Sequence, residues 1–187
     1  MTLATLLTHI QTLHHATPAL HQFAPWPDDI TPATRAPVPV PAIPAIQALP
    51  AKTPLIAAIQ DAAHDVEWRQ SYTADEVGAD FLQAYGYFEL FGPHGHFHST
   101  QLRGYIAYWG PHLDYGWHHH AAEELYCGLI GTPRFTSKSK PDATPPPFET
   151  RHHASWEVHG MQTRDTPYLC YAVWKGPGLA DLPRMSR

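Results

Sequence analysis

The spacing of hydrophobic residues changes near residue 85, from a helical period to short runs of strand type. Residues 1–24 have apolar positions three and four apart, which predicts a first helix with one apolar face. That face carries Leu3, Leu6, Leu7, Ile10 and Leu13. Residues 25–54 contain nine prolines and predict an extended strap with few regular hydrogen bonds. Its apolar residues indicate that it lies against the body of the protein, and they include Val38, Val40, Ile43 and Ile46.

Two further helices are predicted between the strap and residue 85. Thr53 can cap a helix that Pro54 opens, because proline is favoured at the first helical position, and the apolar spacing continues to about Arg69. Thr73 and Glu76 are three residues apart, as in a capping box. They predict a third helix that ends near residue 83 or 84.

From residue 85 onward, short runs rich in Tyr, Phe, Val and Ile are separated by turns that contain Gly and Pro. This spacing predicts a β-sandwich or barrel. The predicted strands are Tyr85–Phe91, Leu102–Trp109, Trp117–His120, Leu125–Ile130, Arg134–Thr136, Ser155–His159 and Tyr168–Trp174, with Pro141–Pro147 as a loop. We therefore expect an α+β protein that is mainly β, in one compact unit. Residues 1–84 would supply helices and a proline-rich strap, packed on a β-barrel formed by residues 85–187.

Composition argues against several classes of function. Charged residues make up only 16% of the chain and the formal net charge is −5, which argues against nucleic acid or an anionic membrane as a partner. No apolar run approaches the roughly 18 residues of a membrane span. The first ten residues lack the basic region of a signal peptide, and Cys127 and Cys170 lie in strand-like runs. A cytoplasmic protein without a disulfide framework is expected. Most of the fifteen histidines are expected at the surface, including His9, His14, His15, His21 and His64.

His118, His120 and Glu124 carry the clearest chemical signal in the chain. Two imidazoles two residues apart face the same side on a strand and opposite sides on a helix. On a straight strand Glu124 would lie roughly 20 Å from His118, whereas metal–ligand bonds are only about 2.0–2.2 Å long. For all three to bind one metal, the chain must turn just before Glu124 and return on a neighbouring strand. The pattern predicts a metal site in a β context, with His119 facing away and Glu123 solvated in the turn.

The stretch from His118 to Gly131 resembles the first motif of the cupin superfamily: HxH, three residues, Glu, six residues, Gly. The glycine that precedes HxH in that motif is displaced here. Tyr115, three residues before the first histidine, and Tyr126, two after the glutamate, are similar to the arrangement in cupin-type dimethylsulfoniopropionate lyases of the DddQ kind. The resemblance covers roughly residues 85–178. It implies a double-stranded β-helix, or jelly-roll barrel, with the N-terminal extension packed on it, and a carbon–sulfur lyase for a small sulfonium substrate.

The resemblance also implies a third imidazole from later in the chain. The candidates are His152, His153 and His159. His159 fits best, although Ser155-Trp156-Glu157 stands where the family has Pro-x-Gly, and His153 is the alternative. The implied ligands of one divalent ion are His118, His120, Glu124 and His159, and the resemblance favours Fe²⁺, Mn²⁺ or Zn²⁺.

A divalent metal with open positions can bind a substrate carboxylate and stabilise the charge that develops when a neighbouring proton is removed. Tyr126 is the expected base, because its parity on the strand matches that of Glu124 and a nearby cation would lower its pKa from about 10 toward neutrality. Without the resemblance, a strand tyrosine would be taken as core. Elimination would give acrylate and dimethyl sulfide, with Tyr115 as a helper near the metal.

Aromatic residues of the predicted strands suit an apolar pocket that tolerates a cation. Those expected in the barrel core are Tyr85, Tyr87, Tyr108, Trp109 and Trp174. Of these, Tyr85 and Trp174 are expected to contact the substrate together with Tyr115.

Three other functions remain open at this stage. A cupin dioxygenase would use the same site with Fe(II) and would consume oxygen. A sugar or sugar-phosphate isomerase would need cationic residues near the pocket, and basic residues are sparse in the predicted strands. A sensor or storage-type barrel would hold a structural metal with all positions closed. The helices before residue 85 could form a lid or the surface of a homodimer.

Overall fold

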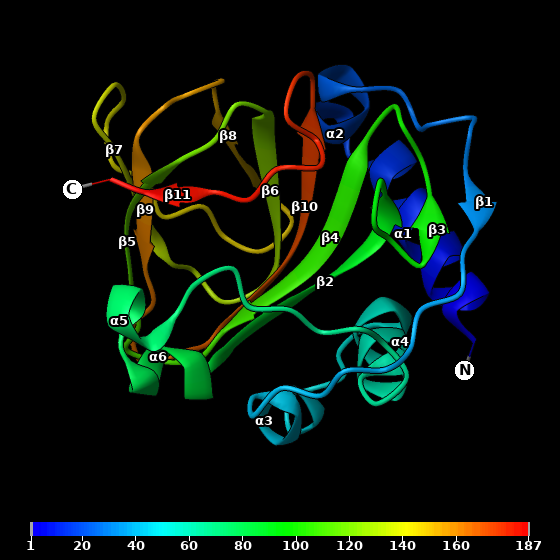
Figure 1. Cartoon of the computed structure of the whole chain (residues 1–187), viewed down its shortest axis with the longest axis horizontal. Helices are drawn as coiled ribbons and strands as arrows, with labels where there is room; N and C mark the ends of the chain where they lie inside the picture. The colour runs from blue at the N-terminus through cyan, green and yellow to red at the C-terminus, as the bar shows by residue number, and fades with distance from the viewer. Residues whose placement is uncertain (1, 187) are drawn as a thin grey trace.

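The computed structural model describes residues 2–186, which form two β-sheets with most of the helices packed on one of them and the last two at one end of the barrel (Figure 1). In spatial order, the larger sheet of this part of the chain consists of β1 (Thr31–Pro32), β3 (Phe97–His98), β2 (Tyr85–Gly92), β4 (Arg103–Trp109), β10 (Tyr168–Lys175), β6 (Glu123–Ile130) and β8 (Thr150–His153). The smaller sheet consists of β11 (Arg184–Met185), β5 (Asp114–His119), β9 (His159–Gln162) and β7 (Arg134–Ser137).

The helices all precede the first long strand, and a proline and a glycine divide two of the predicted helices. They are α1 (Leu3–Ala16), α2 (Pro18–Phe23), α3 (Ile43–Gln47), α4 (Pro54–Ala62), α5 (Ala74–Val77) and α6 (Ala79–Gln83). The single helix predicted over residues 1–24 is wrong, because Pro18 disfavours the helical conformation at Thr17, which is extended. The predicted capping box at Thr73 is confirmed, but Gly78, with φ of +86°, divides the helix that follows.

The helix predicted from Pro54 is confirmed at its start, where the Thr53 side chain accepts a hydrogen bond from the Ile56 amide. It ends at Ala62 instead of continuing to about Arg69. The next segment pairs with the strap: the Trp68 amide donates to Val38 O (3.0 Å). Backbone pairing thus overrides the apolar spacing that suggested a longer helix.

The strap lies on the body of the protein, as predicted, and Val40, Ile43 and Ile46 are buried. Val38, which is expected to be buried with them, has 44% of its surface exposed. It contacts the body through its backbone, which pairs with the segment beyond α4. The strap is also more regular than predicted, since β1 and α3 form within it.

Successive residues of the central strands alternate between the two faces of the larger sheet, and both faces are buried. The face toward α1 and α4 is mainly aliphatic, as in Leu90, Ile106, Leu125, Leu129, Leu169 and Val173. The face toward the smaller sheet is mainly aromatic, as in Tyr85, Tyr87, Tyr105, Trp109, Tyr126, Tyr168 and Trp174. Tyr108 lies on the helix-covered face, so its predicted place in the barrel core is wrong, since adjacent residues of a strand point in opposite directions.

Most predicted strands are confirmed to within a few residues, including β2, β4, β6 and β10. The strand predicted over Ser155–His159 is wrong: these residues form a turn, with Trp156 at φ of +61°, and β9 begins only at His159. The short strands β3, β8 and β11 are not predicted, because β3 and β11 have only two residues each and the four residues of β8, Thr-Arg-His-His, include no hydrophobic one.

The turn predicted before Glu124 is present at residues 121 and 122, and it carries the chain from β5 of the smaller sheet to β6 of the larger. The strand that returns Glu124 is therefore across the barrel from β5 and is not hydrogen-bonded to it. Cys127 and Cys170 are buried free thiols, as predicted. Within residues 2–186, every helix is too short or too polar to cross a membrane.

Candidate metal centre

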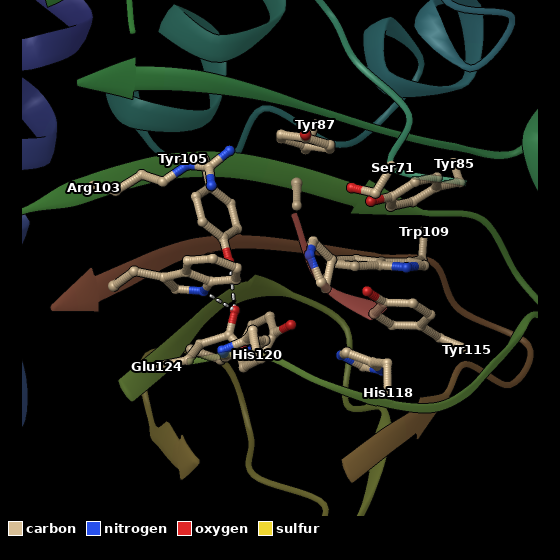
Figure 2. Close-up of a pocket in the computed structure, with 14 residues that line it drawn as sticks. Ser71, Tyr85, Tyr87, Arg103, Tyr105, Trp109, Tyr115, His118, His120 and Glu124 are labelled. Atoms are coloured by element: carbon tan, nitrogen blue, oxygen red, sulfur yellow. Dashed lines mark hydrogen bonds and ion pairs between the residues drawn. The ribbon is translucent and has the colours of Figure 1, made fainter. Parts of the chain in front are cut away.

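Three imidazoles from the smaller sheet meet inside the barrel. His118 on β5 and His159 on β9 are opposite each other in the strand register, and His120 follows the end of β5. Their ligand atoms all lie within 4.8 Å of one another, and all three residues are buried. Figure 2 shows His118 and His120 on the same side of a pocket as Glu124. The spacing of two on an extended segment brings both rings to the interior.

Each of these imidazoles has its Nδ1 within hydrogen-bond distance of a main-chain carbonyl. A carbonyl oxygen can only accept, so the ring proton is on Nδ1 and the lone pair is on Nε2. Local turns thus fix the tautomer that a metal ligand requires. The three bonds are His118 Nδ1 to Gly116 O (3.0 Å), His120 Nδ1 to Ala122 O (2.9 Å) and His159 Nδ1 to Glu157 O (2.8 Å).

The carboxylate of Glu124 faces this cluster with one oxygen and is anchored through the other. Its Oε2 lies 3.1 Å from His120 Nε2 and 3.3 Å from His159 Nε2. Its Oε1 accepts hydrogen bonds from the Tyr105 hydroxyl (2.5 Å) and from the Trp174 indole Nε1 (2.7 Å), drawn as dashed lines in Figure 2. Two donors on neighbouring strands therefore orient the carboxylate so that Oε2 is directed at the imidazoles.

The imidazoles around Glu124 favour its ionised form. Burial alone would raise the pKa of this carboxyl, but His120 and His159 beside it hold the pKa well below its usual range. Burial, followed by the neighbouring imidazole of His159, lowers the pKa of His118 well below 6.5. The cluster thus combines an anionic carboxylate with a neutral imidazole, which is the protonation state in which both groups bind metals.

The donor set fits a divalent transition metal. The Nε2 lone pairs and Glu124 Oε2 are all acceptors, and Nε2 of His159 is buried without a hydrogen-bond partner in the part of the chain that the structure describes. Acceptors that converge without a donor between them repel one another, and a cation at their centre would satisfy all of them. Imidazole nitrogen with carboxylate oxygen is a combination that suits iron, manganese and zinc.

An aromatic pocket opens beside the cluster. Tyr115 stacks on His118 with ring centroids 4.0 Å apart, and its hydroxyl is 2.7 Å from that of Tyr72. Tyr85 and Tyr126 line the same pocket, and Figure 2 shows Tyr85, Trp109 and Tyr115 grouped at one end of it. Burial raises the pKa values of Tyr115 and Tyr126 well above 10, and for Tyr126 the charge of Glu124 adds to the effect. Both phenols are therefore neutral in the metal-free chain.

The other histidines and acids of the motif lie as follows. His119 points away from the cluster, and its Nδ1 is 2.7 Å from Ser186 Oγ. Glu123 is half-exposed and pairs with His152 at 3.1 Å on the outside of the barrel. His153, the alternative third ligand, is not among the converging imidazoles but stacks on His159 with centroids 3.9 Å apart.

Several residues at the centre carry no signal in the sequence. In the sequence, Tyr105 and Tyr72 cannot be distinguished from ordinary core tyrosines. Only the alternation along β4 indicates that Tyr105 faces the barrel interior. The anchoring of Glu124 depends on the register between strands, which places Trp174 opposite it. Trp174, which is expected at the substrate, lines the pocket, and it also donates its indole N–H to Glu124 and stacks on His120 with ring centroids 4.1 Å apart.

The chain is similar to known lyases over nearly all of its length. The sequence profile of the dimethylsulfoniopropionate lyase family matches residues 13–170. The chain is 34% identical over 176 residues to the dimethylsulfoniopropionate lyase DddQ of Ruegeria pomeroyi, which covers 91% of this chain and 88% of that protein. The fold of this chain also matches a chain solved in work on the crystal structures of the DMSP lyases RdDddP and RnDddQII. The two chains have a TM-score of 0.94 at 43% sequence identity, and the match covers 99% of this chain and 97% of that chain.

More distant structures share only the fold. A cupin-2 domain protein of Rhodospirillum rubrum is 14% identical, with a TM-score of 0.51 over 65% of this chain and 76% of that chain. The two-sheet barrel is therefore a cupin fold, as the resemblance of the histidine motif implies.

Proposed function

Because the chain belongs to the dimethylsulfoniopropionate lyase family, we propose that it cleaves dimethylsulfoniopropionate to acrylate and dimethyl sulfide by β-elimination. The observation that carries this proposal is the cluster of His118, His120, His159 and Glu124, whose acceptor atoms converge beside an aromatic pocket. The ligand set, the base and the substrate contacts given below are parts of the same proposal.

The four residues of the cluster would hold one Fe²⁺, Mn²⁺ or Zn²⁺ ion. When bound, this cation would act as a Lewis acid toward the substrate carboxylate. Tyr105 and Trp174 would keep Glu124 Oε2 directed at the ion, since both donate to Oε1. Main-chain carbonyls would keep each imidazole in the ligating tautomer.

Tyr126 would be the general base. It lines the pocket and faces the same side of β6 as Glu124, because the two are two residues apart on a strand. A cation in the cluster would oppose the effects of burial and of Glu124, and so would lower the pKa of Tyr126. Tyr126 Oη would take the proton from the carbon next to the carboxylate. The electrons of that C–H bond would form the double bond of acrylate, and those of the C–S bond would leave with sulfur as dimethyl sulfide.

The sulfonium group would lie against the aromatic wall. Tyr85, Tyr115 and Trp174 line the pocket, and a cation over such rings gains about 0.5–2 kcal/mol. Tyr115 would be held in place by the hydroxyl of Tyr72 and by its stack on His118. A neutral aromatic wall can hold a sulfonium through cation–π contacts without a carboxylate counter-ion.

Arg103 also lines the pocket, but its guanidinium is already bound. Its Nε lies 2.9 Å from Glu89, and its Nη1 donates to the carbonyl of Asp181 at 2.9 Å. It is therefore unsuited to clamp a phosphate, which disfavours a sugar-phosphate isomerase.

A headspace assay tests the proposal. The purified protein would be stripped with a chelator, reloaded separately with Fe²⁺, Mn²⁺ or Zn²⁺, and incubated with dimethylsulfoniopropionate under argon and under air. We expect dimethyl sulfide and acrylate in equal amounts, lost on stripping, restored by at least one metal and independent of oxygen. Absence of dimethyl sulfide with all three metals would refute the lyase, and turnover that requires oxygen would indicate a dioxygenase instead.

A further inference from the structure

The imidazole of His153 lies flat against that of His159, with centroids 3.9 Å apart and an angle of 16° between the ring planes. On its other side, His159 is met edge-on by His118 at 4.1 Å. The ring of His159 is thus enclosed between two other imidazoles. Its Nδ1 bond to the Glu157 carbonyl fixes the tautomer. The stack on His153 restricts rotation of the His159 ring about its side-chain bonds, which a single hydrogen bond would still allow.

Glu157 holds both stacked rings. Its main-chain oxygen accepts from His159 Nδ1, and its carboxylate Oε1 lies 3.3 Å from His153 Nδ1. The carboxylate is fixed in turn by three further donors. These are Ser137 Oγ (2.6 Å), the Ala154 amide (2.8 Å) and Lys140 Nζ (2.7 Å). One residue of the turn before β9 therefore sets the position of two imidazoles through two separate groups.

Packing alone does not account for the imidazole at position 153. The residue is fully buried, and its Nε2 has no hydrogen-bond partner among residues 2–186. An unsatisfied buried acceptor costs about 1–3 kcal/mol, which a phenylalanine of similar shape would avoid. The neighbouring side chains Phe135 and Tyr126 would accommodate such a ring, since both already pack against His153. The imidazole is useful here because its Nδ1 can bind Glu157 while its face supports His159.

We infer that His153 and Glu157 are positioning residues that hold His159 in the orientation in which it binds the metal. The inference rests on the metal centre of the proposed function. In this chain Glu157, in the turn before β9, supplies that orientation through its main-chain oxygen and its carboxylate. A partner that orients a metal-binding imidazole typically contributes 10–100-fold to metal affinity.

The test is the affinity of the folded protein for Co²⁺, measured by competition with a chelator, together with the visible spectrum of the bound Co²⁺. His153→Ala removes the stack, and Glu157→Gln weakens the bond to His153 while keeping the shape of the side chain. We expect the dissociation constant to rise 10–100-fold in the first variant and about tenfold in the second, with an altered spectrum in both. His153→Phe restores a flat ring and should recover part of the affinity lost in His153→Ala.

His152→Ala is the matched control, because the neighbouring imidazole is half-exposed and pairs with Glu123 outside the barrel. It should bind Co²⁺ like the parent. A purely structural role for His153 would lower the melting temperature and leave the Co²⁺ affinity of the folded variants unchanged. The inference is overturned if folded His153→Ala and Glu157→Gln bind Co²⁺ within threefold of the parent with the same spectrum. If the parent itself binds no Co²⁺, the proposed metal centre fails first and the inference fails with it.

Discussion

The two faces of the larger sheet are equally buried, but their side chains differ in kind. Neighbouring residues of one strand provide the contrast: the first of each pair faces the helices and the second faces the smaller sheet. Such pairs are Leu125 and Glu124 on β6, Ile106 and Tyr105 on β4, and Val173 and Trp174 on β10. Burial therefore does not distinguish the candidate site from the structural core of this protein.

What distinguishes the faces is how their polar groups are satisfied. On the helix-covered face, His14 is buried and both its nitrogens are used: Nε2 donates to Ala24 O at 2.9 Å, and Nδ1 is 3.1 Å from the Tyr171 hydroxyl. The expectation of a surface His14 is therefore wrong, since its bonds allow it to be buried. On the other face, each imidazole of the cluster uses Nδ1 for a main-chain bond, and the Nε2 atoms of His120 and His159 face Glu124 Oε2 across the interior. A closed polar pair stabilises a fold, whereas convergent open acceptors form a site for a cation.

Tyr126→Phe should produce the largest effect, confined to the site face. Loss of a general base typically lowers turnover by about 10²–10⁴-fold, and the phenyl ring keeps the packing of the tyrosine. We expect the variant to retain its metal and its unfolding free energy while dimethyl sulfide release falls in the headspace assay. Full dimethyl sulfide release by this variant would remove Tyr126 from the role of base.

Leu125→Ala, one residue earlier on β6, should lower the stability of the protein and leave its metal content and turnover unchanged. Truncation of a fully buried leucine costs about 2–5 kcal/mol of stability through lost burial and the cavity that remains. Urea unfolding should show this loss, whereas metal content and turnover per folded molecule should match the parent. If Leu125→Ala impairs metal binding in the folded protein, the two faces are coupled and the comparison is wrong.

Tyr105→Phe should weaken the metal site without unfolding the protein. It removes one of the two donors to Glu124 Oε1, and loss of such an orienting partner typically costs 10–100-fold in metal affinity. The matched control is Tyr108→Phe, which removes a hydroxyl from the helix-covered face of the same strand. Equal metal affinity in both variants, measured by chelator competition, would contradict the anchoring role of Tyr105.

The smallest effect should be the acid sensitivity of the helix-covered face. Burial is the main cause that lowers the pKa of His14 below 6.5 in the folded protein. Between the folded-state pKa and the unfolded-state pKa of about 6.5, the unfolded chain therefore binds a proton that the folded chain does not. The unfolding free energy should therefore be highest above about pH 6.5 and should fall as the pH is lowered, by at most about 1.4 kcal/mol per pH unit for this group.

Urea unfolding of the metal-free protein at pH 7.5, 6.5 and 5.5 measures this dependence. His14→Gln lacks the titrating group and should show a shallower slope than the parent. Parallel slopes would mean that His14 does not contribute.

Much of the architecture was accessible from the sequence because strand patterns are local. The spacing of His118 and His120, the turn before Glu124 and the alternation along β6 each involve residues that are close in the chain. The family was accessible for the same reason, since Tyr115 and Tyr126 flank one short motif, and its prediction is confirmed. Helix ends were predicted less well, because pairing of the strap with residues beyond α4 stopped a helix that the apolar spacing would have continued.

Periodicity along the chain was enough to predict that His118 and His120 face one space, because it fixes the direction of side chains on a strand, and the motif spacing added Glu124 to them. Three further features became visible only in the folded barrel: the later histidine that joins them, the hydroxyl and indole that hold Glu124, and the stacking of His153 on His159. These contacts join residues from six different strands, and they depend on strand register and on the distance between two sheets. Neither the strand register nor the distance between the sheets can be predicted from the spacing of residues along one segment.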